Sequence, residues 1–590
     1  MNEESITWIP MVGIKVGIYV DPLSVLFVSL ISFFSLVIII YSIGYMAGEE
    51  GLTRYYFFII LFIGAMNGLV ISDNFFQMFI FWEMVGLCSY SLVSFYNKKP
   101  DAVKAGMKVF LMTRVGDVCF LAAIVLLYTS VGSFSFSFII AHIDTVPLPT
   151  LNAVAFLVLG GAIAKSSQLP LHTWLYSAME APTSVSALLH GATMVKAGVY
   201  LLARLFVLYG SRISLIPIWL SCVSWIGAIT GLIGAILALH TNDIKGVPAY
   251  STVSQIGFMI AAIGSATSPA SLGWFAGLFH MFSHAFFQGL GFLAIGGIVH
   301  SVGTRDMRQM GGLRKQMPIT FILCVIVVLA RTGVPPFASF FSKGLILTSL
   351  WSSGDLPLIF TIYAGMAITF SYTLRFIILV FFRERSDKMK QIHFHEPPKI
   401  MLFAAGILAA LCCVWGFLGS LIGRFMQVVV NIGFAEIFSP STLIFLLILC
   451  IGGFPIILIY YNQSRVVRRI RLGLLKLLDT ILRHGFYFDD FYDKIIANGT
   501  MKFSRALNNV VENSFFERIP QAVANGVMRL GKGTIKYFDV AIDKLISTAT
   551  TKTIVIAAKI KKKQSDSLQR LLSVALIGFL IIISIILFTT

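Results

Sequence analysis

Long apolar runs separated by short polar segments are the dominant pattern along this chain. The runs hold about 18–27 residues, and a helix of that length crosses the roughly 30 Å of hydrocarbon in a membrane. Their lengths and spacing predict about fourteen membrane-spanning helices. These cover residues 23–45, 54–71, 75–96, 106–129, 152–177, 184–208, 216–239, 247–266, 271–300, 318–350, 356–382, 400–424, 440–461 and 570–588.

The composition agrees with a membrane protein. Hydrophobic residues make up 57% of the chain and charged residues 12%, whereas soluble proteins hold about 45–50% and about 25%. The formal net charge is +18, but Lys and Arg cluster in short loops between the spans, which is the positive-inside pattern and not a nucleic-acid footprint. Loops 130–150 and 351–355 lack Lys and Arg and are therefore expected outside the cell, together with both termini.

Two predicted spans contain helix-breaking sequences. Pro170 interrupts the fifth span, and TGVPP at 332–336 interrupts the tenth. Proline removes a helical hydrogen bond, and in lipid the freed carbonyls need partners, so such breaks belong in protein interiors or water-lined cavities. The breaks lie at corresponding places in two groups of five spans. Paired breaks of this kind are typical of transporters built from inverted repeats.

The chain changes character near residue 464, where a basic, amphipathic stretch begins. Such a stretch lies along a membrane surface or against partner subunits. We therefore predict an all-α polytopic membrane protein with two inverted five-helix repeats, two broken helices and a C-terminal amphipathic helix. Its parts are an N-terminal segment with the first span (1–53), the first repeat (54–208), the second, inverted repeat (209–382), two additional spans (383–463), the amphipathic region (464–565) and a final anchor (566–590).

Ionisable residues inside the predicted spans are the candidate functional groups, because a charge at mid-membrane costs about 2.5–3.5 kcal/mol on insertion scales. Glu83 and Lys165 lie deep within their spans, and Lys343 directly follows the second break. A functional role is the favoured interpretation for these three. Arg114 and Asp117 are three residues apart on one helical face and could form an ion pair. A structural role and a functional role for this pair are equally favoured.

A polar stripe is predicted on the ninth span, where His280, His284 and Gln288 are spaced by four. Histidines titrate near pH 6.5 and can relay protons through water. Lys196 adds a further charge in the sixth span. His190 is a lone histidine within its span, and such a residue is more often a satisfied core histidine than a functional one.

The chemistry that these residues favour is proton transfer. A buried lysine releases its proton more readily and a nearby carboxylate opposes that release, so Glu83 could switch Lys165 between loaded and unloaded states. The seven cysteines all fall in apolar runs, and none forms a C-x-x-C pair. No nucleophile–base set, phosphate loop or metal cluster is evident. We expect no catalytic residue, metal or redox cofactor on this chain.

Several long motifs resemble one protein family. These are WEMVGLCSY, VKAGMKVFLMTRVGD, GAIAKSSQLPLHTWLYSAMEAPTSVSALLHGATMVKAGVYL, DIKGVPAYSTVSQIGFM, FHMFSHAFFQGLGFL, DMRQMGGLRKQMP and GVPPFASFFSKGLIL. They are similar to subunit L (chain 5) of respiratory complex I, the proton-translocating NADH:quinone oxidoreductase, over roughly residues 20 to 400. FYFDDFYDK, a long amphipathic helix and a last span resemble the lateral helix with which that subunit braces its neighbours.

The resemblance implies roles for individual residues. Glu83 matches the family's essential glutamate, Lys165 its paired pump lysine, and Lys343 the lysine near the proton exit. Further matches are Arg114 and Asp117 in RVGD, His190 in SALxH, His280 and His284 in HxxxH, and Lys196, which is more usual in antiporter and archaeal relatives. Protons would load from the cytoplasmic side, pass Lys165 and the histidines, and leave near Lys343.

The chain departs from the family pattern at several positions. Gln288 stands where many members have a central relay lysine, so water, His284 or another group must bridge that point. Gly344 replaces an acidic residue, and Arg331 is an unexpected charge near the second break that could compensate for Gln288. The chain also begins near the family's third span and lacks about two N-terminal helices.

The resemblance implies a proton-translocating membrane-arm subunit of a complex I-type quinone oxidoreductase in a prokaryotic cytoplasmic membrane. FMN, iron–sulfur clusters and quinone would be bound by partner subunits. Antiporter-like M- and N-type subunits, lipid and protons are the expected partners, and nucleic acid is not. A subunit of a multi-subunit Na+/H+ antiporter or of a membrane-bound hydrogenase is the alternative, and a brace that no longer pumps is a third.

Overall fold

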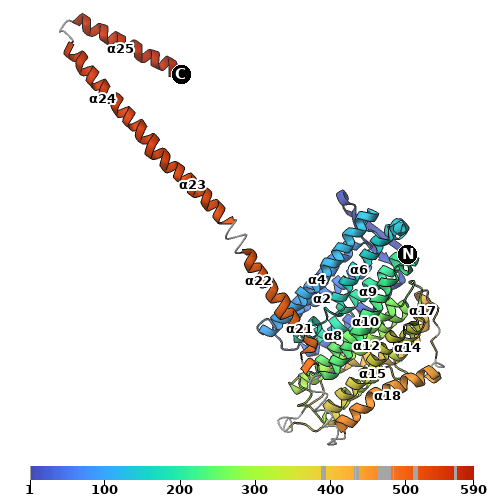
Figure 1. The fold of residues 1–590 in the computed structure, drawn as a ribbon. Coiled ribbons are helices and arrows are strands. Elements are labelled where there is room, and N and C mark those ends of the chain that lie inside the picture. The colour runs from blue at the N-terminus through green and yellow to red at the C-terminus, as the bar shows by residue number, and fades with distance from the viewer. Residues whose placement is uncertain are drawn as a thin grey trace. The chain divides into compact units, whose positions relative to one another are not determined.

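The chain forms a helical structure with two compact units, residues 1–489 and 490–590 (Figure 1). The computed structural model describes residues 2–386, 394–430, 432–433, 437–461, 480–482, 484–508, 516–563 and 568–589.

The first half of the larger unit is a series of apolar helices joined by short turns. They are α1 (Pro22–Tyr45), α2 (Leu52–Ile71), α3 (Phe75–Val93), α4 (Pro100–Val131), α6 (Leu148–Lys165), α8 (Thr183–Gly191) and α9 (Met194–Tyr209). Short elements α5 (Phe136–His142), α7 (Trp174–Ser177) and η3 (Ala178–Glu180) lie between them.

The second half continues in the same way. Its helices are α10 (Pro217–His240), α11 (Gly246–Gly264), α12 (Leu272–Val302), α13 (Pro318–Thr332), α14 (Ala338–Trp351), α15 (Leu356–Ile377), α16 (Lys399–Val414), α17 (Gly419–Phe425) and α18 (Pro440–Tyr461). Within the described residues, 11 helices are long and apolar enough to cross a membrane. The multi-pass all-helical fold is thus confirmed, whereas the count of fourteen and the inverted repeats stay predictions.

The inner helices of this unit differ from the outer ones in burial. In their most apolar stretches, 94% of the residues are buried in Thr183–Leu215 and in Gly246–Gly264, and 83% in Leu272–Val302, against 50% in Pro22–Tyr45. Helix α12 packs against α8, α11, α13, α14 and α16. A helix that is buried on all sides lies in the interior of a bundle. The candidate histidines and Lys196 therefore lie inside the protein and not against lipid.

The first predicted break is present, and its freed backbone groups find protein partners. Helix α6 ends at Lys165, and the Trp174 indole donates to the Ala164 carbonyl at 2.9 Å. The ring of His172 lies 3.2 Å from the Pro170 carbonyl through Nδ1, so this side chain caps a carbonyl of the break. Residues 164–168 and 172–175 on the two sides of the break are buried in protein, whereas Pro170 itself is exposed.

The second break follows the same logic. Helix α13 ends at Thr332, and Gly333 takes the left-handed conformation with φ 87° that commonly ends a helix. The Lys343 ammonium donates to the carbonyls of Arg331 at 2.7 Å and of Thr332 at 3.2 Å. The Ser339 hydroxyl donates to the Ala330 carbonyl, one residue earlier in α13. Because α13 and α14 divide the predicted span 318–350, neither is long enough to span alone.

An N-terminal β-hairpin precedes α1 and was not predicted. Strands β1 (Asn2–Ile9) and β2 (Ile14–Val20) pair antiparallel around a turn that ends at Gly13. The Gln77 side chain on α3 pairs with the Gly17 backbone at 2.9 and 3.0 Å, as a neighbouring strand would. Buried and exposed positions alternate over residues 17–20 of β2, but the exposed Val16, Ile18 and Val20 are apolar, so the sequence carries no matching polar–apolar alternation.

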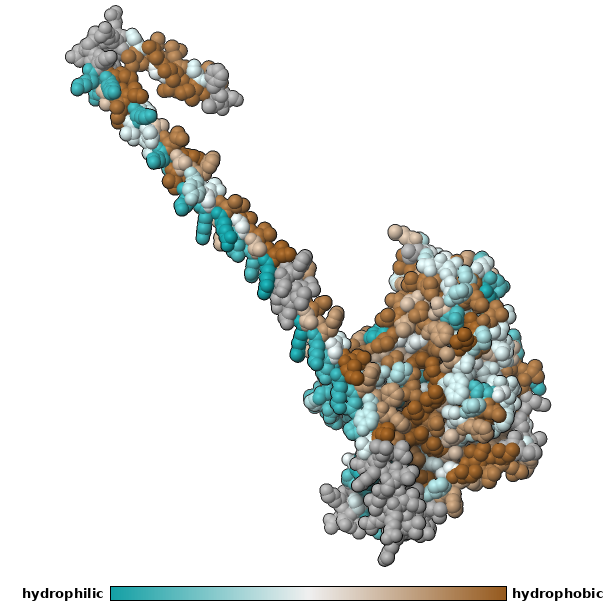
Figure 2. Space-filling model, viewed as in Figure 1, coloured by the Kyte–Doolittle hydropathy of each residue, from teal (hydrophilic) through white to brown (hydrophobic). Residues whose placement is uncertain are grey.

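The smaller unit consists of helices in sequence. They are η11 (Tyr492–Ala497), α22 (Asn498–Leu507), α23 (Arg518–Thr534), η13 (Ile535–Asp539), α24 (Val540–Lys563) and α25 (Leu568–Thr589). Along α23 and α24, apolar side chains gather on one side and polar side chains on another (Figure 2). Helices α23 and α24 of the predicted amphipathic region are therefore two-faced, whereas residues 464–479, 483, 509–515 and 564–565 of that prediction lie outside the described residues.

Candidate functional site

Four predicted residues from three helices form a continuous group of charges. Glu83 on α3 and Arg114 on α4 form an ion pair. Arg114 Nε lies 3.2 Å from Asp117 Oδ2, and Lys165 Nζ on α6 lies 3.5 Å from Asp117 Oδ1. The Arg114–Asp117 pair expected from their spacing is thus confirmed. The four charges alternate in sign, from Glu83 to Lys165.

Burial increases along this group. The side chains of Glu83 and Arg114 are 30% and 26% exposed, whereas those of Asp117 and Lys165 are 3% and 0% exposed. Glu83 and Arg114 therefore reach the surface of the chain, and Lys165 lies wholly inside it. A change at the surface carboxylate can act on the interior lysine through Arg114 and Asp117, because charges interact strongly where water is excluded.

Local packing holds Lys165 and Asp117 in place. The Trp82 indole donates to Asp117 Oδ1 at 2.5 Å, and Lys165 Nζ donates to the Trp82 carbonyl at 3.3 Å. Gly86, one turn further along α3, leaves room for both cations, since a Cβ there would lie 2.9 Å from Lys165 Nζ and would meet the Arg114 guanidinium. The immediate carboxylate partner of Lys165 is Asp117, and Glu83 contacts Arg114.

The predicted polar stripe on α12 is fully buried. His280 lies 2.8 Å from Ser342 Oγ through Nδ1 and 3.1 Å from Gln255 Oε1 through Nε2. The amide nitrogen of Gln288 donates to the Pro248 carbonyl and to Thr252 Oγ1, both at 2.7 Å. Ser342 belongs to α14, directly before Lys343, so the stripe connects the interior of α12 with the second break.

Outside the group from Glu83 to Lys165, three buried candidates have polar atoms without a hydrogen-bond partner in the described part of the protein. These are His190 and His284 at both ring nitrogens and Lys196 at Nζ. All three are 0% exposed, and Lys196 acts electrostatically on both His280 and His284. Buried polar atoms of this kind require an additional partner such as water. In sequence order, Lys165 precedes these three residues and Lys343 follows them.

A second cluster of charges lies outside the predicted site residues, around η3 and the loops before α11 and after α12. Arg305 forms ion pairs with Glu180, at 2.7 Å, and with Asp243. Lys245, in the loop before α11, is only 4% exposed and donates to the carbonyls of Met179 and Ala181, each at 2.7 Å. Burial, aided by the positive charge of Arg305, lowers the pKa of Lys245 to about 7.

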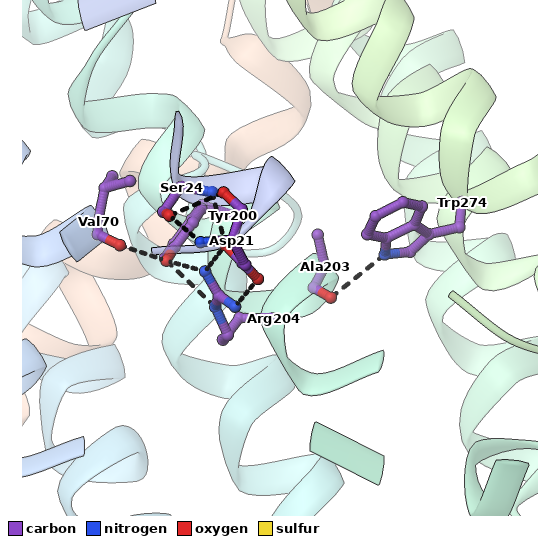
Figure 3. A network of polar contacts seen from close by, with 7 residues as sticks. All are labelled: Asp21, Ser24, Val70, Tyr200, Ala203, Arg204 and Trp274. Atoms are coloured by element: carbon purple, nitrogen blue, oxygen red, sulfur yellow. Dashed lines mark hydrogen bonds and ion pairs between the residues drawn. The ribbon is translucent and has the colours of Figure 1, made fainter. Parts of the chain in front are cut away.

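A fully buried ion pair between α1 and α9 was missed altogether (Figure 3). Arg204 donates to Asp21 through both terminal nitrogens, at 2.5 and 3.0 Å. Its Nη2 also donates to the Tyr200 hydroxyl at 2.8 Å. The Tyr200 hydroxyl donates in turn to the Val70 carbonyl on α2 at 2.7 Å. Every partner is satisfied, so this network fixes the start of α1. Its signals were Asp21 before Pro22 and the single arginine in LLARLFVLY.

Among the described residues, no group of three or more His, Cys, Asp or Glu side chains is arranged to hold a metal ion. The ionisable side chains of the site are carboxylates, lysines and histidines, which can bind and release protons. Their arrangement is suited to moving a proton through a buried interior.

Comparison with protein families gives two matches. The family described as "NADH:quinone oxidoreductase/Mrp antiporter, TM" matches residues 72–369, and the family described as "NADH-Ubiquinone oxidoreductase (complex I), chain 5 N-terminus" matches residues 8–56. Every predicted site residue lies within residues 72–369, whereas most of α2 (Leu52–Ile71) falls between the two matches.

Individual relatives are similar over most of the chain. The NAD(P)H-quinone oxidoreductase chain 5 of Picosynechococcus is 35% identical over 84% of this chain and 80% of its own length. The NADH-quinone oxidoreductase subunit L of Rickettsia bellii is 36% identical over 83% and 79%. The Na(+)/H(+) antiporter subunit A1 of Staphylococcus aureus is 36% identical over 70% of this chain but only 54% of its own length.

Two solved structures share the fold. A chain of the Mrp complex from Dietzia superposes with a TM-score of 0.74 and 26% identity, over 90% of this chain and 57% of that chain. A chain of the membrane-bound sulfane sulfur reductase, an archaeal respiratory membrane complex, superposes with a TM-score of 0.73 and 24% identity, over 90% and 92%. The second likeness shows the fold alone.

Proposed function

This chain belongs to the family of integral membrane subunits shared by NADH:quinone oxidoreductases and Mrp antiporters, and we propose that it translocates protons as the subunit-L-type member of a quinone oxidoreductase complex. The coverage of its relatives supports the choice within the family. The chain spans 80% and 79% of the two quinone oxidoreductase subunits but 54% of the antiporter subunit.

The observation that carries the proposal is the alternating group of Glu83, Arg114, Asp117 and Lys165. Arg114 lies between two carboxylates and can favour either one. While Glu83 is ionised it holds Arg114, and Asp117 is free to stabilise the charged form of Lys165. Protonation or movement of Glu83 releases Arg114 toward Asp117, which weakens the hold of Asp117 on the Lys165 ammonium. Lys165 then gives up its proton.

The path onward follows the buried polar residues. From Lys165 the proton passes the region of His190 and Lys196, reaches His284 and His280, and leaves through Lys343. Water bridges the ring nitrogens of His190 and His284 and the Lys196 amine, because these atoms have no partner in the described part of the protein. Loading occurs from the cytoplasmic side, in a prokaryotic cytoplasmic membrane.

Electron transfer takes place in other subunits. Partner subunits bind FMN, iron–sulfur clusters and quinone, and antiporter-like M- and N-type subunits adjoin this chain. The amphipathic helices α23 and α24 act as a lateral brace against those neighbours. Their two-faced surface, apolar on one side and polar on another, supports that role.

The test is proton pumping in membranes that contain the whole complex. Lys165→Ala and Glu83→Gln should each abolish or sharply reduce donor-driven acidification of inverted vesicles, while the complex still assembles. Matched controls are Lys98→Ala and Glu50→Gln, which alter an ion pair whose side chains are 84% and 87% exposed; both should pump normally. An unchanged ratio of protons to electrons in both site variants would refute the assignment.

A Na+/H+ antiporter subunit is the second candidate. The Dietzia Mrp fold and the Staphylococcus aureus antiporter subunit favour it, since both match this chain over its core. Proton efflux from vesicles driven by added Na+, with no response to any electron donor, would establish the antiporter in place of the oxidoreductase.

A further inference from the structure

Arg331 is a buried cation near the end of α13. It is 2% exposed, and its Nε has no hydrogen-bond partner within the described ranges. Among the described residues, no Asp or Glu forms an ion pair with it. Unlike Arg204, whose charge is matched by Asp21, this guanidinium keeps its full positive charge in the interior.

Gln288 is shaped to receive this cation. Its amide nitrogen donates to the Pro248 carbonyl and to Thr252 Oγ1, and this fixes the amide so that Oε1 faces the other way. Oε1 accepts from Arg331 Nη2 at 3.3 Å. A lysine at position 288 could not accept this hydrogen bond and would place a second positive charge against the first.

Gly291 makes room for the guanidinium. It lies on α12 one turn beyond Gln288, and a Cβ there would be 2.8 Å from Arg331 Nη2. Gly86 plays the same part for Arg114 and Lys165 in the first half. The guanidinium of Arg331 on α13 therefore fits a site on α12 that consists of the Gln288 acceptor and the space at Gly291.

This arrangement is joined to Lys343. Lys343 Nζ donates to the backbone carbonyl of Arg331 itself, so the ammonium is held at the end of α13, where the Arg331 charge acts on it. The titratable or polarisable groups on which the Arg331 charge acts come from five helices and are His284, Cys324, Lys343, Tyr372 and Cys412. None of these is an acid that is ionised at neutral pH.

We propose that Arg331 is a positioning residue of the proton path, whose permanent charge, held by Gln288, opposes a second positive charge on Lys343 and so drives release of the Lys343 proton. In the release step an N–H bond of the Lys343 ammonium breaks, the proton passes to water on the exit side, and the electron pair stays on Nζ. The C-terminal carbonyls of α13 hold the ammonium until that step. The inference rests on the proposed function.

The experiment compares three variants in the assembled complex, with donor-driven vesicle acidification and the ratio of protons to electrons as readouts. Arg331→Met removes the charge with little change in length and should lower pumping about tenfold. Arg331→Lys keeps a cation at the site and should retain most of it. The double variant Gln288→Lys with Arg331→Met moves the charge across the pair and should pump better than Arg331→Met alone.

The double variant separates charge from shape, since it restores a cation but not the original hydrogen bond. Normal pumping by Arg331→Met would overturn the inference. So would a double variant that assembles and pumps no better than Arg331→Met. If Arg331→Met does not assemble, the inference stands only if the double variant assembles and pumps, and it falls otherwise. Loss of pumping in Lys165→Ala alongside normal pumping in Arg331→Met would sink this inference and leave the proposed function intact.

Discussion

Three buried cations of this chain are held by different sets of partners. Arg204 has a carboxylate and a phenol, Lys165 has a carboxylate and a backbone carbonyl, and Lys343 has the carbonyls at the end of α13. Burial of a charge without a partner is costly, so the quality of the partner sets how firmly each proton is held. Fully paired Arg204 is structural, and the less completely paired lysines are the ones suited to release a proton.

Gly86 tests this argument at a single residue. In Gly86→Ala the new methyl would lie 2.9 Å from Lys165 Nζ and would meet the Arg114 guanidinium, and both are ends of flexible side chains that can move away. We expect the complex to assemble and proton pumping to fall several-fold, because the alternating charges lose their spacing. Vesicle acidification measures this.

The matched control for that variant is Gly64→Ala on α2, where a Cβ would meet nothing within 4 Å. It makes the same chemical change inside a neighbouring helix and should leave pumping unchanged. Equal effects of the two substitutions would contradict the role assigned to the space at Gly86.

At the level of helices, the two candidate lysines lie at the two breaks: Lys165 ends α6, and Lys343 lies in the first turns of α14. Both breaks were predicted from Pro170 and from the TGVPP segment, because proline inside an apolar run interrupts the hydrogen bonds of a membrane-spanning helix. The partners of the freed carbonyls, Trp174 and Lys343, could not be predicted, since they depend on contacts across the turn. The Asp21–Arg204 pair was missed for the same reason: its members are 183 residues apart.

Removal of Asp21 would show how much this pair contributes. Asp21→Asn leaves Arg204 buried beside a neutral amide, and loss of one partner of a buried pair costs about 3–5 kcal/mol. We expect a clearly lower thermal unfolding midpoint for the purified complex in detergent. Asp306→Asn, which alters a pair with an Arg308 side chain that is 62% exposed, is the control and should change the free energy of unfolding by about 0–1 kcal/mol.

The pH dependence of the same pair has a definite sign. Burial raises the pKa of Asp21, but the charge and hydrogen bonds of Arg204 outweigh burial and lower it overall. A carboxyl with a lowered pKa stabilises the fold above its ordinary range, and this stabilisation is lost as the pH falls through the lowered pKa. The difference in unfolding midpoint between wild type and Asp21→Asn should therefore shrink in acid and stay constant from about pH 6 to 8; a difference that grows in acid would contradict the assignment.

For the whole molecule, composition and run length were sufficient for the membrane fold, and the motifs around Glu83, Lys165 and His280 were sufficient for the family. The N-terminal hairpin was not predicted, because its strands are short and stand beside long apolar runs that dominate the pattern. The link from Glu83 to Lys165 through Arg114 and Asp117 could not be predicted either, since spacing along the chain relates only Arg114 to Asp117. The sequence thus points to candidate residues, and the structure shows which of them are in contact.

The central claim is that this chain moves protons for a redox-driven complex. Purification of the chain in mild detergent, followed by mass spectrometry of everything that remains bound, tests it most directly. The account predicts iron–sulfur and quinone-site subunits in the same particle, together with antiporter-like membrane subunits. A particle that holds only small membrane subunits and no redox protein would contradict the account and favour the Na+/H+ antiporter.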